Sequence, residues 1–211
     1  MELMGALFSP FVRKAALVLA EKGLAFENPP FSFAEPSEDF LAASPFRKIP
    51  ALKDGDFLIS DSTAIAAYLD ALHPEPALYP AEPRARARAV WFEEVADTIM
   101  VPKAGPAIYN RFVVPRMFGK PGDEGAAVAA MKAFASAMDY LEASVPDDGW
   151  LAGDFSIGDI AVGSVLRTLD YIGESLAVSR YPRVASWYGR LTARPAWQAV
   201  AELEAAAFAA A

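Results

Sequence analysis

Short apolar runs and helix-period segments alternate over the first part of the chain. Leu3–Phe8 is an apolar run of strand length. Ser9-Pro10 follows with an N-cap residue and a proline at the first helical position, which predicts a helix over Pro10–Lys22. Phe26–Asn28 is a candidate second strand. The chain therefore begins with a βαβ pattern.

The next segments predict a hairpin and a helix. Ile49–Lys53 and Phe57–Ser60 flank the turn dipeptide Asp54-Gly55, which favours two antiparallel strands. Before them, Ser37–Ala43 begins with a capping serine and has the length of one or two helical turns. After them, Asp61–Leu72 carries apolar residues at helical spacing. The order βαβ, irregular segment, ββα predicts an α/β unit with a four-stranded mixed sheet and helices on its faces.

A proline-rich segment separates this unit from the rest of the chain. Residues 74–83 hold Pro74, Pro76, Pro80 and Pro83, a composition typical of a linker. We therefore expect one domain over residues 1–73, a linker over 74–83 and a second domain over 84–211.

The second domain is predicted to be all-helical. Its alanine-rich segments favour helix. The expected helices are Arg84–Met100, an interrupted segment to Gly122, Asp123–Ala143, Ser156–Ile172, Pro182–Leu191 and Pro195–Phe208. Ser156 and Asp159 have the spacing of a capping box, and the helix that they begin has a broad apolar stripe, as a central core helix does.

Composition and charge exclude several classes of function. The 211 residues carry 27 Asp and Glu against 19 Lys and Arg, a formal charge of −8 that disfavours binding to nucleic acid or anionic lipid. With no cysteine and one histidine, we expect no disulfide and no metal site. The sequence shows neither a membrane-spanning run nor a signal peptide, so we expect a cytoplasmic protein without membrane contact.

Four motifs, in this order, carry a resemblance to a known family. They are Ser9-Pro10-Phe11-Val12-Arg13-Lys14, Lys48-Ile49-Pro50-Ala51-Leu52, Asp61-Ser62-Thr63-Ala64-Ile65 and the Ser156–Asp159 capping box. Over essentially its whole length the chain resembles the soluble glutathione S-transferases, as a bacterial serine-type member. The resemblance implies a thioredoxin-like N-terminal domain that binds glutathione and an all-helical C-terminal domain.

Ser9 is the candidate catalytic residue. A hydroxyl at a helix N-terminus can donate a hydrogen bond to a nearby thiolate, which lowers the pKa of the thiol. The simpler interpretation is that Ser9 only caps the helix. Ser9 aligns with the cysteine of omega-like members, and a hydroxyl there cannot form a mixed disulfide. Other serine-type members carry the activating hydroxyl one position earlier, where this chain has Phe8.

The remaining motifs supply candidate glutathione-binding residues, with Phe11 beside Ser9. The resemblance implies that Pro50 is a cis proline and that the backbone of Ile49, after Lys48, pairs with the cysteinyl part of glutathione. It assigns Asp61 and Ser62 to the γ-glutamyl group, with Asp61 one methylene shorter than the usual glutamate. A plain strand-start proline and a plain Asp-Ser helix cap are the alternatives.

The second-substrate pocket is less clearly marked. Residues 100–118 mix prolines with aromatic side chains, and we expect Tyr109 and Phe112 to line an apolar pocket, with interhelical packing as the alternative. The predicted function is a detoxifying, homodimeric glutathione transferase that uses glutathione as cosubstrate and a small hydrophobic electrophile. An inactive binding module with this fold, or a glutathione-dependent lyase or isomerase, are the other hypotheses.

Overall fold

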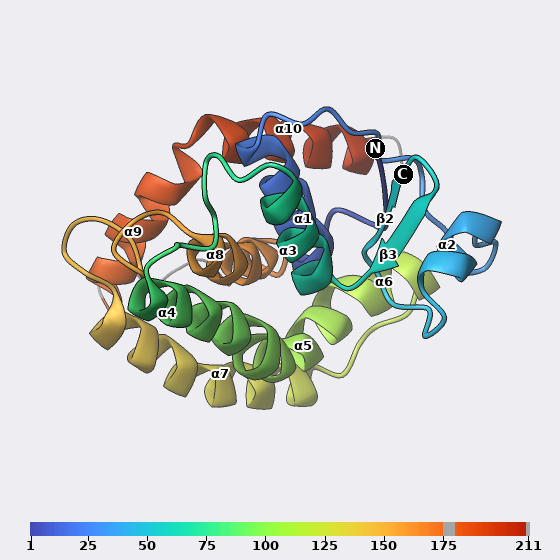
Figure 1. Cartoon of the computed structure of the whole chain (residues 1–211). Coiled ribbons are helices and arrows are strands. Elements are labelled where there is room, and N and C mark those ends of the chain that lie inside the picture. Colours follow the sequence, from blue (N-terminus) through green and yellow to red (C-terminus); the bar gives the residue numbers. More distant parts are fainter. Residues whose placement is uncertain (175–179, 210–211) are drawn as a thin grey trace. The chain divides into compact units, whose positions relative to one another are not determined.

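The computed structural model describes residues 1–174 and 180–209 (Figure 1). The chain divides into two compact units. The first unit contains Met1–Ala81 and the segment that begins at Thr192, and the second contains Glu82–Leu191. The sequence predicts a single domain from residue 84 onward. In space the last helix packs with the amino-terminal unit instead.

The sheet of the first unit has three antiparallel strands in the order β1-β2-β3. They are β1 (Glu2–Met4), β2 (Ala51–Asp54) and β3 (Phe57–Ser60). Leu3 lies opposite Leu52 in the register, and both side chains are fully buried. The hairpin between β2 and β3 confirms the prediction from its turn dipeptide.

The expected fourth strand, Phe26–Asn28, is a correction to the predicted sheet. Only Glu27 bridges to β1, in parallel, and it accepts a hydrogen bond from the Leu3 amide at 2.8 Å. Pro29 has no N–H group and cannot donate the next hydrogen bond of the ladder. The side-chain amide of Asn28 donates to the Leu3 carbonyl at 2.7 Å, and the pairing ends there.

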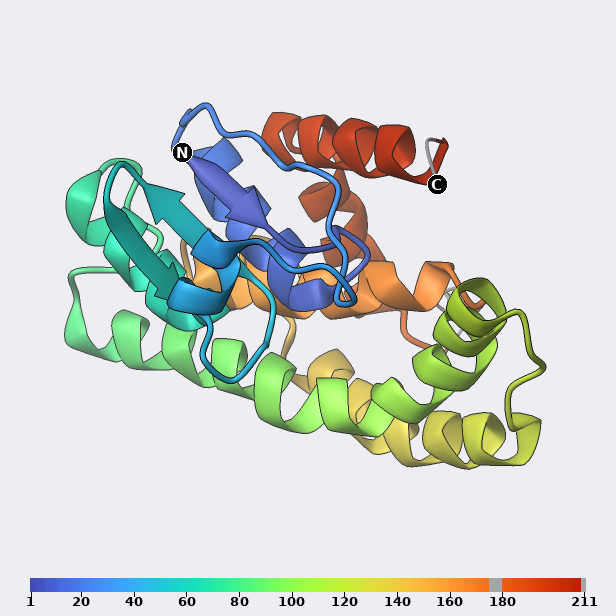
Figure 2. The same cartoon turned by 90° about the vertical axis from the view of Figure 1, so that its right-hand side faces the viewer.

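Four helices complete the first unit (Figures 1 and 2). They are α1 (Pro10–Glu21), α2 (Glu38–Ala43), α3 (Ser62–Leu72) and α10 (Pro195–Ala209). Helix α1 is the central element, because it packs against β1, α3 and α10. Its side chains from Val12 to Leu19 are all buried, so the helix is covered on several sides, as its largely apolar composition predicts.

The named elements of the second unit are all helices, and two isolated β-bridges, Trp150 with Gly153 and Ala152 with Asp154, lie in the loop before the helix that begins at Ile157. Its elements are α4 (Pro83–Glu94), η1 (Val95–Met100), α5 (Val101–Ile108), η2 (Tyr109–Val113), α6 (Val114–Phe118), α7 (Glu124–Ser144), α8 (Ile157–Asp170) and α9 (Pro182–Thr192). The π-helical segment η2 lies in the segment that was expected to be interrupted, whereas η1 falls within the expected helix Arg84–Met100, which therefore is not α-helical to its end. A proline lacks the N–H group that an α-helical hydrogen bond needs, and wider turns nearby accommodate that loss.

The capping box predicted at the start of α8 is present. Asp159 is fully buried and accepts hydrogen bonds from the amides of Leu151 and Ser156, both at 3.0 Å, and from the Trp187 indole at 2.9 Å. Burial raises the pKa of the Asp159 carboxyl, and these hydrogen bonds oppose that rise. The box therefore joins the start of α8 to the preceding loop and to α9.

Candidate functional site

Ser9 stands at the N-cap of α1 with extended backbone angles, φ −68° and ψ 129°. Its side chain makes no capping hydrogen bond, although it is in the position to do so. The backbone of Ser9 is fixed instead, because its amide donates to the Ala6 carbonyl at 3.0 Å and its carbonyl accepts from the Arg13 amide at 3.0 Å. Phe11, two residues along, is half-buried. The hydroxyl of Ser9 is therefore not used to cap the helix.

The Ile49–Pro50 peptide bond is cis, as expected. Pro50 is buried and its carbonyl accepts a hydrogen bond from the Asp61 amide at 3.3 Å, so the start of β2 and the start of α3 are adjacent. The loop before Ile49 is held by Ser44, whose hydroxyl donates to the Lys48 carbonyl at 2.7 Å and accepts from the Lys48 amide at 2.9 Å. The side chain of Lys48 is exposed.

Asp61 has the backbone angles φ 82° and ψ 128°, a region that residues other than glycine rarely occupy. Its Oδ1 atom accepts from the amides of Thr63 and Ala64 at 2.9 and 3.1 Å, so the capping interpretation of this residue is realised. A backbone of this kind costs about 1–3 kcal/mol and is concentrated at functional sites. Ser62 is buried at the first position of the helix.

Gly5 is a residue of this region that the sequence analysis missed. It has φ 143°, and a Cβ atom there would lie 2.7 Å from Val12 Cγ2 and 3.0 Å from Ile49 Cβ. Glycine therefore allows β1, α1 and the loop before β2 to approach one another. An isolated glycine within an apolar strand pattern is the signal that could have identified it.

Two adjacent cations of α1, Arg13 and Lys14, were also missed as contributors. Their exposed fractions are 2% and 1%, although charged side chains are almost never fully buried unless they are paired. The Lys14 ammonium donates to the Thr63 hydroxyl at 3.0 Å and joins α1 to the first turn of α3. The signal in the sequence for these residues is a pair of positive charges within an otherwise apolar helix.

The two residues predicted to line a second-substrate pocket differ in burial. Phe112 is 6% exposed, stacks on Tyr171 with ring centroids 5.1 Å apart, and has the Arg116 guanidinium 5.0 Å from its ring centre. Tyr109, on the same segment η2, is 50% exposed. Phe112 thus takes part in packing within the second unit, and Tyr109 presents its ring to solvent.

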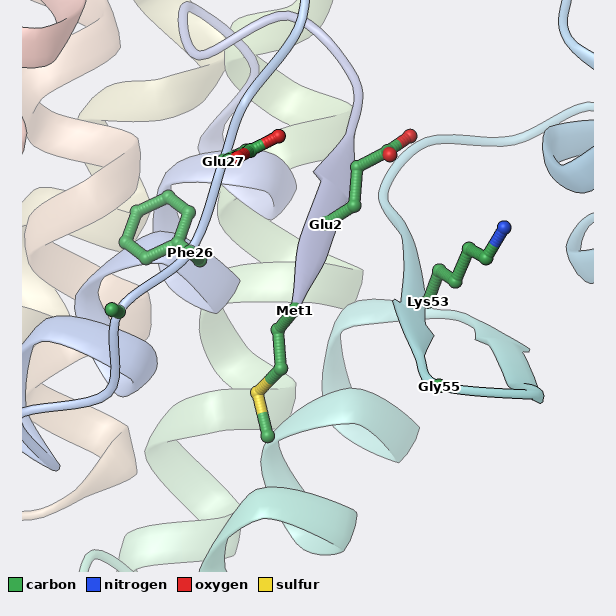
Figure 3. Close-up of a pocket in the computed structure, with 7 residues that line it drawn as sticks. Met1, Glu2, Phe26, Glu27, Lys53 and Gly55 are labelled. Atoms are coloured by element: carbon green, nitrogen blue, oxygen red, sulfur yellow. The ribbon is translucent and has the colours of Figure 1, made fainter.

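A surface pocket of about 460 Å³ lies elsewhere in the first unit (Figure 3). Glu2, Glu27 and Lys53 extend toward one side in Figure 3, and Met1 extends away from them. None of the predicted site residues is among the described residues that line it. Within residues 1–174 and 180–209 we find neither a group of side chains suited to hold a metal ion nor a helix able to cross a membrane.

Two protein families match the chain. The family described as the N-terminal domain of glutathione S-transferase matches residues 3–77, and the family described as its C-terminal domain matches residues 89–190. The first match contains the candidate residues from Ser9 to Ser62, and the second contains Tyr109 and Phe112.

Curated relatives and solved structures agree with the family matches. Glutathione S-transferase 3 of Zea mays is 34% identical, with 94% of this chain and 91% of that protein covered. Probable glutathione S-transferase GSTF2 of Oryza sativa subsp. japonica is 30% identical, with 96% of each covered. A glutathione S-transferase-I structure bound with lactoylglutathione superposes with a TM-score of 0.86 at 28% identity, covering 96% of this chain and 98% of that one.

The solved structure of a bacterial protein is similar to this chain with nearly the same TM-score. The glutathione S-transferase of Rhodospirillum rubrum F11 has a TM-score of 0.85 at 26% identity, covering 94% of this chain and 90% of that one. The two curated relatives named above are from plants, so the bacterial serine-type subclass stays a prediction.

Proposed function

Because the chain belongs to the glutathione S-transferase family and is a glutathione transferase, we propose that Ser9, Ile49–Pro50 and Asp61-Ser62 form its glutathione site. One observation carries this proposal: the Ser9 hydroxyl, at the N-terminus of α1, is not used to cap the helix. The hydrogen bond from the Asp61 amide to the Pro50 carbonyl supports it further, because it places two of the three segments side by side.

The proposed chemistry begins with the thiol of glutathione. The Ser9 hydroxyl donates a hydrogen bond to the sulfur, and the partial positive charge at the start of α1 favours a negative charge there. The thiol proton passes to solvent, and the thiolate electron pair forms the new bond to the electrophilic carbon. Where the electrophile carries a leaving group, that group departs with the electron pair of the bond that breaks.

The rest of glutathione is recognised through backbone and charge. The amide and carbonyl of Ile49 pair with the cysteinyl peptide unit as one strand pairs with another, and Phe11 and Lys48 flank this peptide. The Ser62 hydroxyl and amide, at the start of α3, bind the γ-glutamyl carboxylate. Asp61 attracts the γ-glutamyl ammonium with the carboxylate that also caps α3.

The electrophile is a small hydrophobic molecule, and Tyr109 and Phe112 belong to the wall of its pocket. Tyr109 contacts the molecule directly, a role supported by its 50% exposure. Phe112 supports this wall without contacting the electrophile, because its ring is already stacked on Tyr171. Glutathione is thus bound by residues 1–73, as expected, and the electrophile by helices of the second unit, Glu82–Leu191.

The protein acts as a homodimer in the cytoplasm, where it detoxifies electrophiles. Exposed aromatic side chains support self-association; among them, Phe46 is 84% exposed in the first unit and Trp91 is 55% exposed in the second. Such side chains are enriched in interfaces between subunits.

Calorimetry and kinetics test the glutathione site. Titration of reduced glutathione and of S-hexylglutathione should show saturable binding of both, with a more negative heat-capacity change for the hexyl form because it buries more apolar surface. In Ser9→Ala, the rate of conjugation to 1-chloro-2,4-dinitrobenzene should fall by about tenfold or more, because the lost donor stabilises the reacting thiolate.

The binding measurement separates a lost catalytic group from a lost site. Ser9→Ala should bind glutathione with nearly unchanged affinity, since the hydroxyl contacts the sulfur and the rest of the tripeptide is bound elsewhere. A rate within about twofold of the unsubstituted protein would remove Ser9 from the mechanism. Binding without conjugation of any electrophile would favour a non-catalytic module or a lyase or isomerase.

A further inference from the structure

Helices α1 and α10 lie side by side in the first unit (Figures 1 and 2), and two ion pairs join α1 to α10 and to Arg194, the residue before it. Near the start of α1, the Nε and Nη2 atoms of Arg13 donate to Glu204 Oε1 at 2.8 and 2.5 Å. At the other end of α1, Arg194 donates to the two carboxylate oxygens of Glu21, both at 2.7 Å. The first pair is buried to 2% exposure on both sides, and the second is more accessible at 29% for Arg194 and 9% for Glu21.

Arg13 makes a further contact with the turn that precedes α1. Its Nη2 atom also donates to the Phe8 carbonyl at 3.3 Å. This carbonyl belongs to the peptide that joins Phe8 to Ser9, and the amide of the same peptide donates to the Ala6 carbonyl at 3.0 Å. Both polar groups of the peptide before Ser9 are therefore held, one of them by a side chain that is itself fixed to α10.

We propose that Arg13 is a positioning residue for the reaction: with Glu204 of α10 as its anchor, it fixes the Phe8–Ser9 peptide and so aims the Ser9 hydroxyl at the sulfur of glutathione. This inference rests on the proposed function of Ser9. Arg13 acts through the backbone, and its guanidinium is committed to Glu204 and Phe8. The carboxyl-terminal helix thereby contributes to the reaction through a buried contact with the turn.

The chemistry of the two side chains explains why this arrangement is specific. A guanidinium is planar and presents its donors in a fixed fork, so the bonds from Nε and Nη2 to Glu204 fix the direction in which Nη2 donates to the Phe8 carbonyl. A lysine ammonium is a compact charge on a flexible stem and cannot reproduce this geometry. Glu204 neutralises the buried charge, which would otherwise carry a large desolvation cost.

The test compares Arg13→Lys with the matched control Glu21→Gln. Glu21→Gln weakens the ion pair of α1 with Arg194, the residue before α10, and leaves the contact of Arg13 with Phe8 intact. The measured quantity is the pKa of the thiol of bound glutathione, followed by the ultraviolet difference absorbance of the thiolate as pH rises. In Arg13→Lys we expect this pKa to rise by about one unit, which is about a tenfold loss of thiolate at a pH below both values.

The kcat of conjugation and the KM for glutathione should respond differently to the loss of Arg13. In Arg13→Lys the kcat of conjugation should fall while the KM for glutathione stays unchanged, because Arg13 does not contribute to the proposed glutathione contacts. Glu204→Gln keeps the shape of the acid and an acceptor oxygen and leaves Arg13 itself in place, so it is the second variant, and near-ultraviolet circular dichroism checks that both variants are folded. Glu204→Gln should shift the thiol pKa in the same direction by less, and Glu21→Gln should not shift it.

Two results would overturn the inference. One is an unchanged thiol pKa in both Arg13→Lys and Glu204→Gln. The other is an equal rise in Glu21→Gln, since that would attribute the effect to docking of α10 alone. If the unsubstituted protein bound no glutathione and formed no thiolate, the proposed function would fail together with this inference. An unshifted thiol pKa in both Arg13→Lys and Glu204→Gln, when the unsubstituted protein forms the thiolate, would reject this inference alone.

Discussion

Lys22 and Asp70 form an ion pair at 2.8 Å that holds the segment by which the chain leaves the first unit. The side chain of Lys22 is fully buried, and its ammonium also donates to the carbonyls of His73 and Pro76 at 2.6 and 2.8 Å. Asp70 accepts from the Leu78 amide at 2.8 Å. The proline-rich linker is therefore fixed to α1 and α3 by these two charges.

Replacing Lys22 with methionine should destabilise the protein strongly. The substitution removes the cation, so that Asp70, only 13% exposed, loses its ion-pair partner, and the carbonyls of His73 and Pro76 lose their donor. Breaking a buried pair on one side costs about 3–5 kcal/mol. The free energy of unfolding from urea titration measures this loss.

Lys53→Met is the matched control, because Lys53 pairs with Asp39 at the surface, where the two side chains are 37% and 42% exposed. An exposed ion pair contributes little to stability, so this variant should unfold close to the midpoint of the unsubstituted protein. If Lys22→Met and Lys53→Met lost the same free energy of unfolding, burial would not be what makes the Lys22–Asp70 ion pair contribute more to stability.

Gly5→Ala should impair glutathione binding more than turnover. The new Cβ would lie 2.7 Å from Val12 Cγ2 and 3.0 Å from Ile49 Cβ, so it should displace the loop that carries Ile49. The positive φ of 143° adds backbone strain. The KM for glutathione should rise by more than kcat falls, as steady-state kinetics would measure.

Gly55→Ala controls for the backbone part of this effect. Gly55 has φ 61° in the hairpin turn, and a Cβ there would meet nothing within 4 Å. Gly55→Ala should therefore lose about 1 kcal/mol of stability without any change in the KM for glutathione. A normal KM in Gly5→Ala would contradict the role assigned to the contact with Ile49.

Much of the fold could be predicted because its signals are local. The proline after Ser9 marked the start of α1, Asp54-Gly55 marked the hairpin, and the spacing of Ser156 and Asp159 marked the start of α8. The absent fourth strand depends on one donor that Pro29 cannot supply, a detail that strand propensity does not include.

The position of α10 could not be predicted in the same way. Its place in the first unit depends on pairs such as Arg13 with Glu204, which are 191 residues apart in sequence. Sequence periodicity carries no information on such distant partners. The same limit applies to the site. Motifs identified Ser9, Pro50 and Asp61, whereas the contribution of Gly5 became visible only from its neighbours in space.

Acid should remove the contribution of the Glu82 side chain to stability. Glu82 caps α4, and hydrogen bonds from the amides of Arg84 and Ala85, at 3.0 and 2.7 Å, lower the pKa of its carboxyl below the ordinary value of 4.5. A lowered pKa in the folded state means that this contribution is present above the ordinary pKa and is lost as the pH falls through the folded value.

Thermal denaturation of Glu82→Gln and of the unsubstituted protein, from about pH 7 down to about pH 3, measures this effect. Glu82→Gln should melt at a lower temperature at neutral pH, because a neutral amide interacts less with the helix N-terminus than a carboxylate does. The difference should shrink as Glu82 becomes protonated. A difference that grows toward acid pH would contradict this assignment.

Tyr109→Ala and Phe112→Ala should have opposite effects on stability and substrate binding. Phe112 is 6% exposed and stacked on Tyr171, so Phe112→Ala leaves a cavity and should cost about 3–5 kcal/mol of stability. Tyr109 is 50% exposed, and its removal should leave the unfolding midpoint almost unchanged.

If Tyr109 contacts the electrophile, Tyr109→Ala should raise the KM for an apolar electrophile and leave the KM for glutathione unaltered. Urea titration and steady-state kinetics on both variants separate these effects. An unchanged KM for several apolar electrophiles of different size would place the second-substrate pocket away from η2.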